Sequence, residues 1–469
     1  MQIKHNDLII NQEAPFANCK LDREKYAHVL TSIVNNYADG FVLAINNEWG
    51  TGKTTFVKMW QKHLAKNGFE TLYFNAWEND FESNPLVAIL AELKTLTGDH
   101  DKTKFKSLLK KGAVLTKNVL PAFAKAMLDR YVDNKILLDG IEGATKATTE
   151  ILEKEVESYA TRKRSLEEFR KQLEEYLQDT ESKKPVVFFI DELDRCRPSY
   201  AVEVLEQMKH FFAVPGIVFV LAIDKIQLGH AIRGIYGSEQ LNADEYLRRF
   251  IDIEYSIPQP DTKQFCNYLF KYFSFADFFD TEERQSYGDT SRDSEAFISI
   301  ASSLFDKKKI TLRQQEKIFA HSRLALKMFK PNSYLLPNLF FFLTYINSLH
   351  KDFYRQIQSK QLSFQQLTDE FYQVIPVGLN EDEAHDFMYL QADLLVTFSS
   401  SQKPYSGKET LMTGKAGIDE KPLIPSKFDK SENNQLYASI LKSVMNTRMS
   451  RTPIDHLLKK IDLIEPVIA

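Results

Sequence analysis

The chain has 469 residues, of which 43% are hydrophobic and 26% charged, and its formal net charge is −4. This is the composition of an ordinary globular protein, and the small negative charge gives no global electrostatic reason to bind nucleic acid or membranes. Three widely spaced cysteines, an odd number, argue against a disulfide framework or a zinc site and fit a reducing, cytoplasmic setting.

Targeting and membrane segments are not expected from the sequence. The first residues have no basic region followed by an apolar run, so no signal peptide is predicted. The stretch that comes closest to a membrane span is residues 335–346. It is shorter than the ~20 residues that a spanning helix needs, and it predicts a buried helix.

Short apolar runs in the first half of the chain predict β-strands. Helical patterns separate them: Phe56, Trp60 and Leu64, for example, recur at intervals of four after the first run. Strands that alternate with helices favour a parallel sheet covered on both faces. The expected class is α/β, a mostly parallel sheet flanked by helices, with strands at residues 41–46, 71–74, 186–190, 217–223 and 251–257.

Two further regions differ from this pattern. Residues 95–165 lack clear strands and include a basic segment, 101–130, with eight Lys/Arg against two Asp. Beyond Pro260 the chain is rich in Phe, Leu, Lys and Gln, which predicts a helical domain. We therefore expect a core at residues 1–260, with about 95–165 as a helical insertion. Residues 261–469 would form a C-terminal helical lid or partner-binding domain, in which residues 399–435 resemble a loop.

The first predicted strand is followed by a phosphate-loop pattern, Asn47-Glu48-Trp49-Gly50-Thr51-Gly52-Lys53-Thr54, and then by a helix. This is nearly G-x-x-x-x-G-K-[ST] in the context that the motif requires. Asn47 replaces the first glycine, and asparagine tolerates a left-handed backbone. Gly50 and Gly52 would let the backbone N–H groups approach phosphates.

The end of this pattern predicts ATP and Mg²⁺ as ligands. Lys53 would reach the β- and γ-phosphates, and the Thr54 hydroxyl would bind Mg²⁺. Thr55 follows directly and is expected to line the same site.

The strand predicted at residues 186–190 ends in two acids, Asp191 and Glu192. This is a Walker B arrangement: Asp191 would hold the hydration shell of Mg²⁺, and Glu192 would polarise the attacking water. A Glu directly after the Asp indicates one class of P-loop proteins. In that class the catalytic acid lies on the strand next to the neighbour of the phosphate-loop strand. A merely solvated acidic turn is the alternative, and the phosphate loop upstream argues against it.

In combination, these motifs resemble the KAP P-loop NTPases over roughly residues 20–330. Bacterial members of that family are implicated in phage exclusion. Many members carry membrane helices in the long insertion, and such helices are not predicted in this sequence. The resemblance rests on the tryptophan-bearing phosphate loop, the block Phe74-Asn75-Ala76-Trp77, the extended Walker B Ile190-Asp191-Glu192-Leu193-Asp194-Arg195-Cys196, and residues 204–209, 219–224 and 246–250.

The resemblance implies roles for four further residues. Asp224 occupies a sensor-1-like place, with a helix N-cap as an equal alternative. Arg248 and Arg249 stand where related ring-forming ATPases place a finger that acts on a neighbouring subunit, with a surface pair as an equal alternative. Arg313 resembles a sensor-2 arginine, with a solvated helix start as the alternative.

Other side chains near the motifs have simpler expected roles. Asp194 and Arg195 are expected to pair with each other or with a neighbouring subunit. Trp49 and Trp77 are expected to be packing residues in the core.

The motifs predict a cytoplasmic ATPase that acts as a nucleotide-driven switch or motor, and the resemblance implies a role in anti-phage defence. It would work as a homo-oligomer with a separate effector protein, since no nuclease, protease or deaminase motif is evident. One alternative is a slow-hydrolysing scaffold that recruits partners according to the bound nucleotide. Another is a DNA-associated ATPase that uses the basic segment, although a solvated helix face explains that segment better.

Overall fold

The computed structural model describes residues 9–37, 40–82, 84–96, 105, 108, 146–178, 184–211, 213–286, 290–306, 310–333, 335–402, 411–414, 420–447 and 452–463. The chain divides into two compact units, Asp7–Gln259 and Pro260–Ala469, and each is described by itself. The basic segment 101–130 lies outside the described residues, apart from Phe105 and Leu108.

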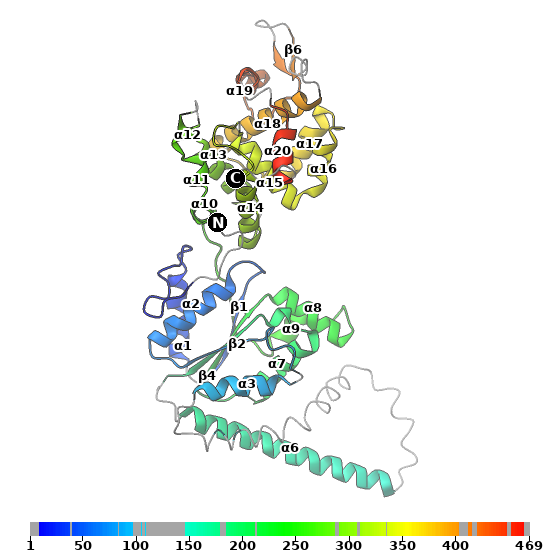
Figure 1. Ribbon diagram of the computed structural model, residues 1–469. Helices are drawn as coiled ribbons and strands as arrows, with labels where there is room; N and C mark the ends of the chain where they lie inside the picture. Colours follow the sequence, from blue (N-terminus) through cyan, green and yellow to red (C-terminus); the bar gives the residue numbers. More distant parts are fainter. Residues whose placement is uncertain are drawn as a thin grey trace. The chain divides into compact units, whose positions relative to one another are not determined.

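The first unit is built on a five-stranded parallel sheet, as the sequence predicts (Figure 1). The strand order is β2-β3-β4-β1-β5, so β4 lies between the phosphate-loop strand β1 and the acidic strand β3. One strand, β4, therefore separates the acidic strand from the phosphate-loop strand, as the sequence pattern predicts. The strands are β1 (Val42–Asn46), β2 (Thr71–Asn75), β3 (Val186–Asp191), β4 (Ile217–Ile223) and β5 (Ile253–Tyr255).

Side chains of the central strands alternate between two buried cores, one on each face of the sheet. On one face, Leu43 and Ile45 pack with helices α1 (Glu24–Asn36) and α2 (Lys53–Lys66). The other face is covered by α3, α6, α7, α8 and α9, as Figure 1 shows for α3, α7 and α8. Burial on both faces explains why β3 and β4 are continuous apolar runs and not alternating ones. These helices are α3 (Pro85–Leu93), α6 (Lys146–Gln178), α7 (Pro198–Phe211), α8 (Lys225–Tyr236) and α9 (Ala243–Leu247), with the short helices η1 (Lys94–Leu96) and η3 (Leu193–Arg195).

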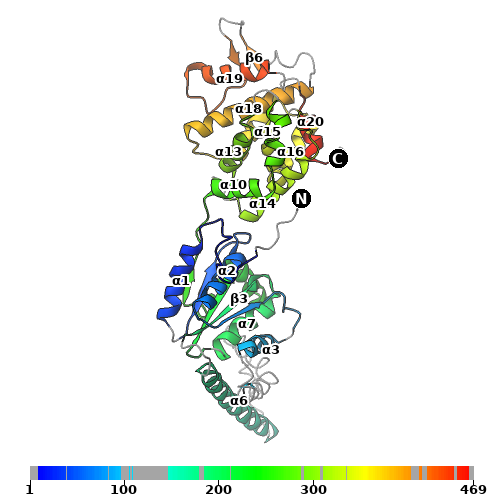
Figure 2. The same cartoon turned by 60° about the vertical axis from the view of Figure 1, so that its left-hand side comes forward.

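The second unit is helical in its described residues, apart from a two-stranded ribbon. Its centre is α15 (Pro337–Leu349), whose residues from Leu339 to Ile346 are buried, as expected for residues 335–346 (Figure 2). The other elements are α10 (Thr262–Tyr272), α11 (Ala276–Phe279), α12 (Glu282–Gln285), α13 (Asp293–Asp306), α14 (Leu312–Leu326), α16 (Lys351–Ser359), α17 (Phe364–Val374), α18 (Glu381–Gln402), β6 (Met412–Thr413), β7 (Lys421–Pro422), η5 (Glu432–Asn434), α19 (Gln435–Asn446) and α20 (Asp455–Ile461).

Two sequence expectations need adjustment. The limit placed near residue 165 falls inside α6, a single helix that begins at Lys146. Residues 399–435, predicted to be a loop, include the end of α18, and Asp429 accepts a 2.7 Å hydrogen bond from the backbone N–H of Tyr437. Among the described residues, no helix is both long and apolar enough to cross a membrane.

Candidate functional site

The loop between β1 and α2 has the backbone conformation that its glycines predict. Gly50 and Gly52 adopt φ angles of 82° and 80°, in the left-handed region that residues with a Cβ avoid. Helix α2 begins directly after Gly52, and no side chain in the described part of the chain caps its first N–H groups. The first turn of a helix therefore presents free donors to an anion at the carboxyl edge of the sheet, where open α/β sheets bind ligands.

Asn47 has a different role from the one predicted for it. It is not among the described residues with positive φ, so tolerance of a left-handed backbone is the wrong explanation. Its side-chain amide instead donates to the carbonyl of Ile257 and accepts from the N–H of Ile257, both at 2.9 Å. Its own N–H donates to Ile223 O at 3.2 Å. Asn47 thus fastens the start of the loop to β4 and to the segment that follows β5.

Lys53 is folded into the loop. Its side chain is only 8% exposed, and its ammonium donates to the carbonyls of Asn47 and Glu48, the latter at 3.2 Å. Burial lowers the pKa of Lys53, and the nearby Asp194, Asp224 and Asp191 oppose that change. The buried ammonium therefore lies among carboxylates, in the concave part of the loop.

Asp191 is held firmly at the end of β3. It is 1% exposed and accepts hydrogen bonds from the Tyr73 hydroxyl and from the N–H of Glu192, both at 2.8 Å. Thr54 is the second residue of α2. Carboxylate and hydroxyl oxygens are ligands that Mg²⁺ accepts, and Mg²⁺ at nucleotide sites takes few protein ligands. These two residues fit that pattern, and the described residues contain no larger group of metal-binding side chains.

Both carboxylate oxygens of Glu192 are engaged. Oε1 forms an ion pair with Arg195, and Oε2 accepts a 3.3 Å hydrogen bond from Asn75 Nδ2. Burial raises the pKa of Glu192, while Arg195 and Asn75 act in the opposite direction. Glu192 has a left-handed backbone, with φ of 60°, which for a non-glycine residue is a strained conformation.

Asp194 and Arg195 do not pair with each other. Asp194 is buried and accepts a hydrogen bond from the Trp49 indole, and burial raises its pKa. Arg195 pairs with Glu192, and its guanidinium lies over the Trp77 ring, 5.6 Å from the centroid. The two side chains point in different directions because the residues are consecutive in the short helix η3.

The prediction that Trp49 and Trp77 are core residues is wrong. They are 42% and 53% exposed, respectively, whereas Trp60 of α2 is fully buried. Each exposed ring contacts a polar residue next to Glu192, so the two tryptophans belong to the edge of the candidate site. Among the described residues, Asn75 and Tyr73 are site residues that sequence reasoning missed. The signals for Asn75 were its place at the end of a strand and its membership of the block 74–77 that carries the family resemblance.

Asp224 has the predicted helix N-cap position and also contacts the phosphate loop. Its Oδ1 caps α8 by accepting from the N–H groups of Ile226 and Gln227, at 3.2 and 3.3 Å. Its Oδ2 accepts from the N–H of Trp49 in the phosphate loop, at 3.2 Å. The residue is therefore an N-cap that also contacts the loop, and a cavity of about 250 Å³ lies beside it, lined also by Glu48 and Thr51.

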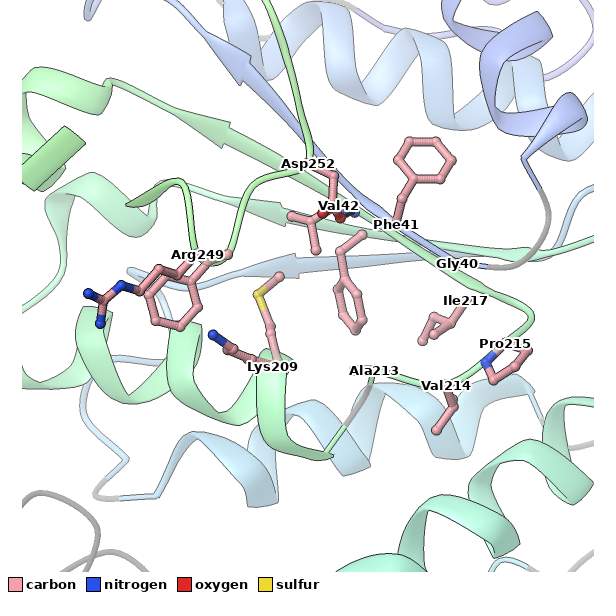
Figure 3. Close-up of a pocket in the computed structure, with 13 residues that line it drawn as sticks. Gly40, Phe41, Val42, Lys209, Ala213, Val214, Pro215, Ile217, Arg249 and Asp252 are labelled. Atoms are coloured by element: carbon pink, nitrogen blue, oxygen red, sulfur yellow. Dashed lines mark hydrogen bonds between the residues drawn. The ribbon is translucent and has the colours of Figure 1, made fainter. Parts of the chain in front are cut away.

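Arg249 lies at the opposite end of the sheet from the phosphate loop. Arg248 is exposed and pairs with Glu245 at 3.0 Å. Arg249 lines a cavity of about 300 Å³ at the amino ends of β1 and β4, together with Lys209 and Asp252 (Figure 3). A strand rises by about 3.3 Å per residue, so the whole length of β1 separates the amino ends of the strands from the phosphate loop. The structure therefore does not bring Arg249 to the loop of the same chain.

The remaining predicted residues are less informative. Thr55 is half-buried in the first turn of α2. Arg313 is exposed in the first turn of α14, which Thr311 and Gln314 cap reciprocally. Arg313 belongs to the second unit.

Comparisons with known proteins give a family match and two similar proteins. A model described as the KAP family P-loop domain matches residues 23–451. An uncharacterised protein of Methanocaldococcus jannaschii is 31% identical over 176 residues, which cover 33% of this chain and 89% of that protein. The solved structure of the Aeropyrum pernix ORC2 protein, in ADPNP and ADP complexes, covers 94% of this chain and 93% of its own at 13% identity and a TM-score of 0.32.

Proposed function

Because the chain belongs to the KAP family of P-loop NTPases, we propose that it binds ATP with Mg²⁺ and hydrolyses it to drive a change of shape or assembly. One arrangement carries this proposal. A glycine-rich loop with a buried lysine lies at the same sheet edge as a buried Asp191 and a Glu192 held by two partners.

In this proposal the loop binds the phosphates. Free N–H groups at the start of α2 receive phosphate oxygens, and the Lys53 ammonium exchanges the carbonyls of Asn47 and Glu48 for the β- and γ-phosphates. Thr54 and Asp191 are the residues that would hold Mg²⁺. The ion, when bound with ATP, neutralises negative charge on the phosphate oxygens.

Glu192 is the proposed general base. It accepts a proton from a water molecule as the water oxygen bonds to the γ-phosphorus and the bond to the β–γ bridging oxygen breaks, giving ADP and phosphate. Because both oxygens of Glu192 already accept from Arg195 and Asn75, one of these partners has to move before the carboxylate can accept a proton from water. The described arrangement is therefore a resting one.

The position of Arg249 supports a role between subunits. A guanidinium at the amino edge cannot reach the phosphates of its own chain, whereas a neighbouring copy could present it to them. We therefore propose a homo-oligomer in which Arg249, or Arg248, completes the site of the next subunit. Asp224 and Arg313 stay proposed sensors, and residues 261–469 a proposed lid or partner-binding domain.

The wider role that we propose is a switch or motor in bacterial anti-phage defence, acting with a separate effector. Support for it comes from the family's bacterial members and from the lack of an effector motif in the sequence. A nucleotide-gated scaffold with slow turnover is the second candidate, supported by the occupied state of Glu192.

Phosphate release and particle mass, measured together without nucleotide, with ADP and with ATP, test the proposal. Turnover that needs Mg²⁺ and a change in mass with ATP support the motor or switch. A change in mass with almost no turnover supports the scaffold. If the chain does not bind ATP at all, both candidate functions are contradicted.

A further inference from the structure

Arg23 is buried directly behind the phosphate loop. It is 4% exposed, and its two terminal nitrogens donate to the carbonyls of Gly52, at 3.1 Å, and Thr51, at 2.8 Å. We propose that Arg23 is a positioning residue for nucleotide binding, one that orients the loop peptides toward the phosphates. This inference rests on the proposed binding of ATP at the loop.

The geometry of the peptide group links Arg23 to the phosphate side. In a trans peptide, the C=O and N–H bonds point in opposite directions. The Thr51 carbonyl shares its peptide group with the N–H of Gly52, and the Gly52 carbonyl shares its own with the N–H of Lys53. By fixing both carbonyls, Arg23 directs these two N–H groups away from itself, to the other face of the loop.

Among the described residues, Arg23 forms no ion pair with a carboxylate. Its Nε is buried without a hydrogen-bond partner, and its guanidinium contacts backbone carbonyls only among the described residues. Burial lowers the pKa of Arg23. A buried cation without a paired anion is unfavourable. A polyphosphate on the loop would supply the missing negative charge, so Arg23 favours the occupied loop over the empty one.

Arg23 is also attached to a rigid support. It immediately precedes α1, and α1 packs along α2, the helix that begins at the loop. The Trp60 indole donates to the Thr31 hydroxyl at 2.9 Å. The His28 and His63 rings pack edge to face, with their centroids 4.8 Å apart. The guanidinium is thus held from outside the loop by a packed helix pair.

The test uses Arg23→Met, Arg23→Lys and a matched control, Thr31→Val, which removes a hydrogen bond between α1 and α2 without touching the loop. Melting temperature without nucleotide and affinity for ATP and for inorganic triphosphate are measured for each. Arg23→Met should weaken both affinities by about tenfold or more, as expected for lost charge-assisted hydrogen bonds. Its melting temperature should fall no further than that of Thr31→Val.

Arg23→Lys should recover part of the affinity, since an ammonium keeps the charge but cannot span both carbonyls as a guanidinium does. A lower melting temperature with wild-type affinity would mean that Arg23 only joins α1 to the loop, and would overturn the inference. If Arg23→Met does not fold, Arg23→Lys decides: wild-type affinity rejects the inference and reduced affinity supports it. Wild-type protein that binds neither ligand would instead remove the proposed function.

Discussion

Asn75 donates a hydrogen bond to the Glu192 carboxylate at 3.3 Å and so joins the end of β2 to the turn that follows β3. Arg195 binds the other carboxylate oxygen. The residue proposed to activate water is therefore held on both sides by groups that reduce its basicity, and this relationship governs how hydrolysis would be controlled.

Removal of the Asn75 amide should make Glu192 a better base. We expect Asn75→Ala to raise basal turnover by about three- to tenfold, the effect of part of one hydrogen bond to a charged group. Steady-state phosphate release at saturating ATP is the measurement. A loss of turnover as large as that of a Glu192 variant would show instead that Asn75 positions Glu192 or the water.

Lys53→Ala should abolish ATP binding, because the loop loses the ammonium that would contact the phosphates. Lys66→Ala, at the exposed far end of the same helix, is the matched control and should bind as the wild type does. Isothermal titration with ATP checks both variants. Unchanged affinity for Lys53→Ala would refute the assigned site.

Arg249→Ala should bind ATP normally but hydrolyse it slowly, because the charge on the transferred phosphoryl group would no longer be stabilised from the next subunit. Wild-type turnover per chain should rise with protein concentration. If Arg249→Ala is fully active, Arg248→Ala is the second candidate.

A mixing experiment tests the same idea. Arg249→Ala protein supplies an intact nucleotide pocket, and an excess of Lys53→Ala protein supplies an intact arginine, so the mixture should regain activity. The absence of any rescue, together with turnover independent of concentration, would favour a monomeric switch.

Glu206 of α7 should make the first unit less stable as the pH rises. Burial, reinforced by Glu203, raises the pKa of Glu206 to about 7, from an ordinary value of 4.5. The folded chain therefore retains a proton that the unfolded chain releases, and stability is lost between about pH 4.5 and pH 7. Glu206→Gln should melt progressively higher than the wild type across this range. A difference that does not change with pH would contradict the shift.

The centre of the sheet could be predicted from the sequence because β3 and β4 are buried on both faces and so consist of apolar runs. The last strand is shorter than predicted: only Ile253–Tyr255 pair, from a predicted 251–257. The start of α6 could not be placed, because nearly half of its residues are charged and its apolar residues are weakly periodic.

The candidate site was predictable where its residues are contiguous. Asn47 to Thr54 and Asp191 to Glu192 are local motifs, and the loop glycines have the predicted backbone. The contacts Asn75–Glu192, Trp49–Asp194 and Arg23–Thr51 join residues distant in sequence, and they depend on strand order and helix packing. No local pattern specifies such pairings, which is why Trp49 and Trp77 were wrongly expected in the core.

The turnover of Glu192→Gln tests most directly whether this chain hydrolyses ATP with Glu192 as the base. The variant keeps the size and shape of the side chain, but it replaces one acceptor oxygen by an NH2 donor and cannot accept the proton. We predict that it binds ATP as tightly as the wild type while turnover falls by roughly 100-fold or more. Turnover close to that of the wild type, with ATP binding intact, would contradict the account.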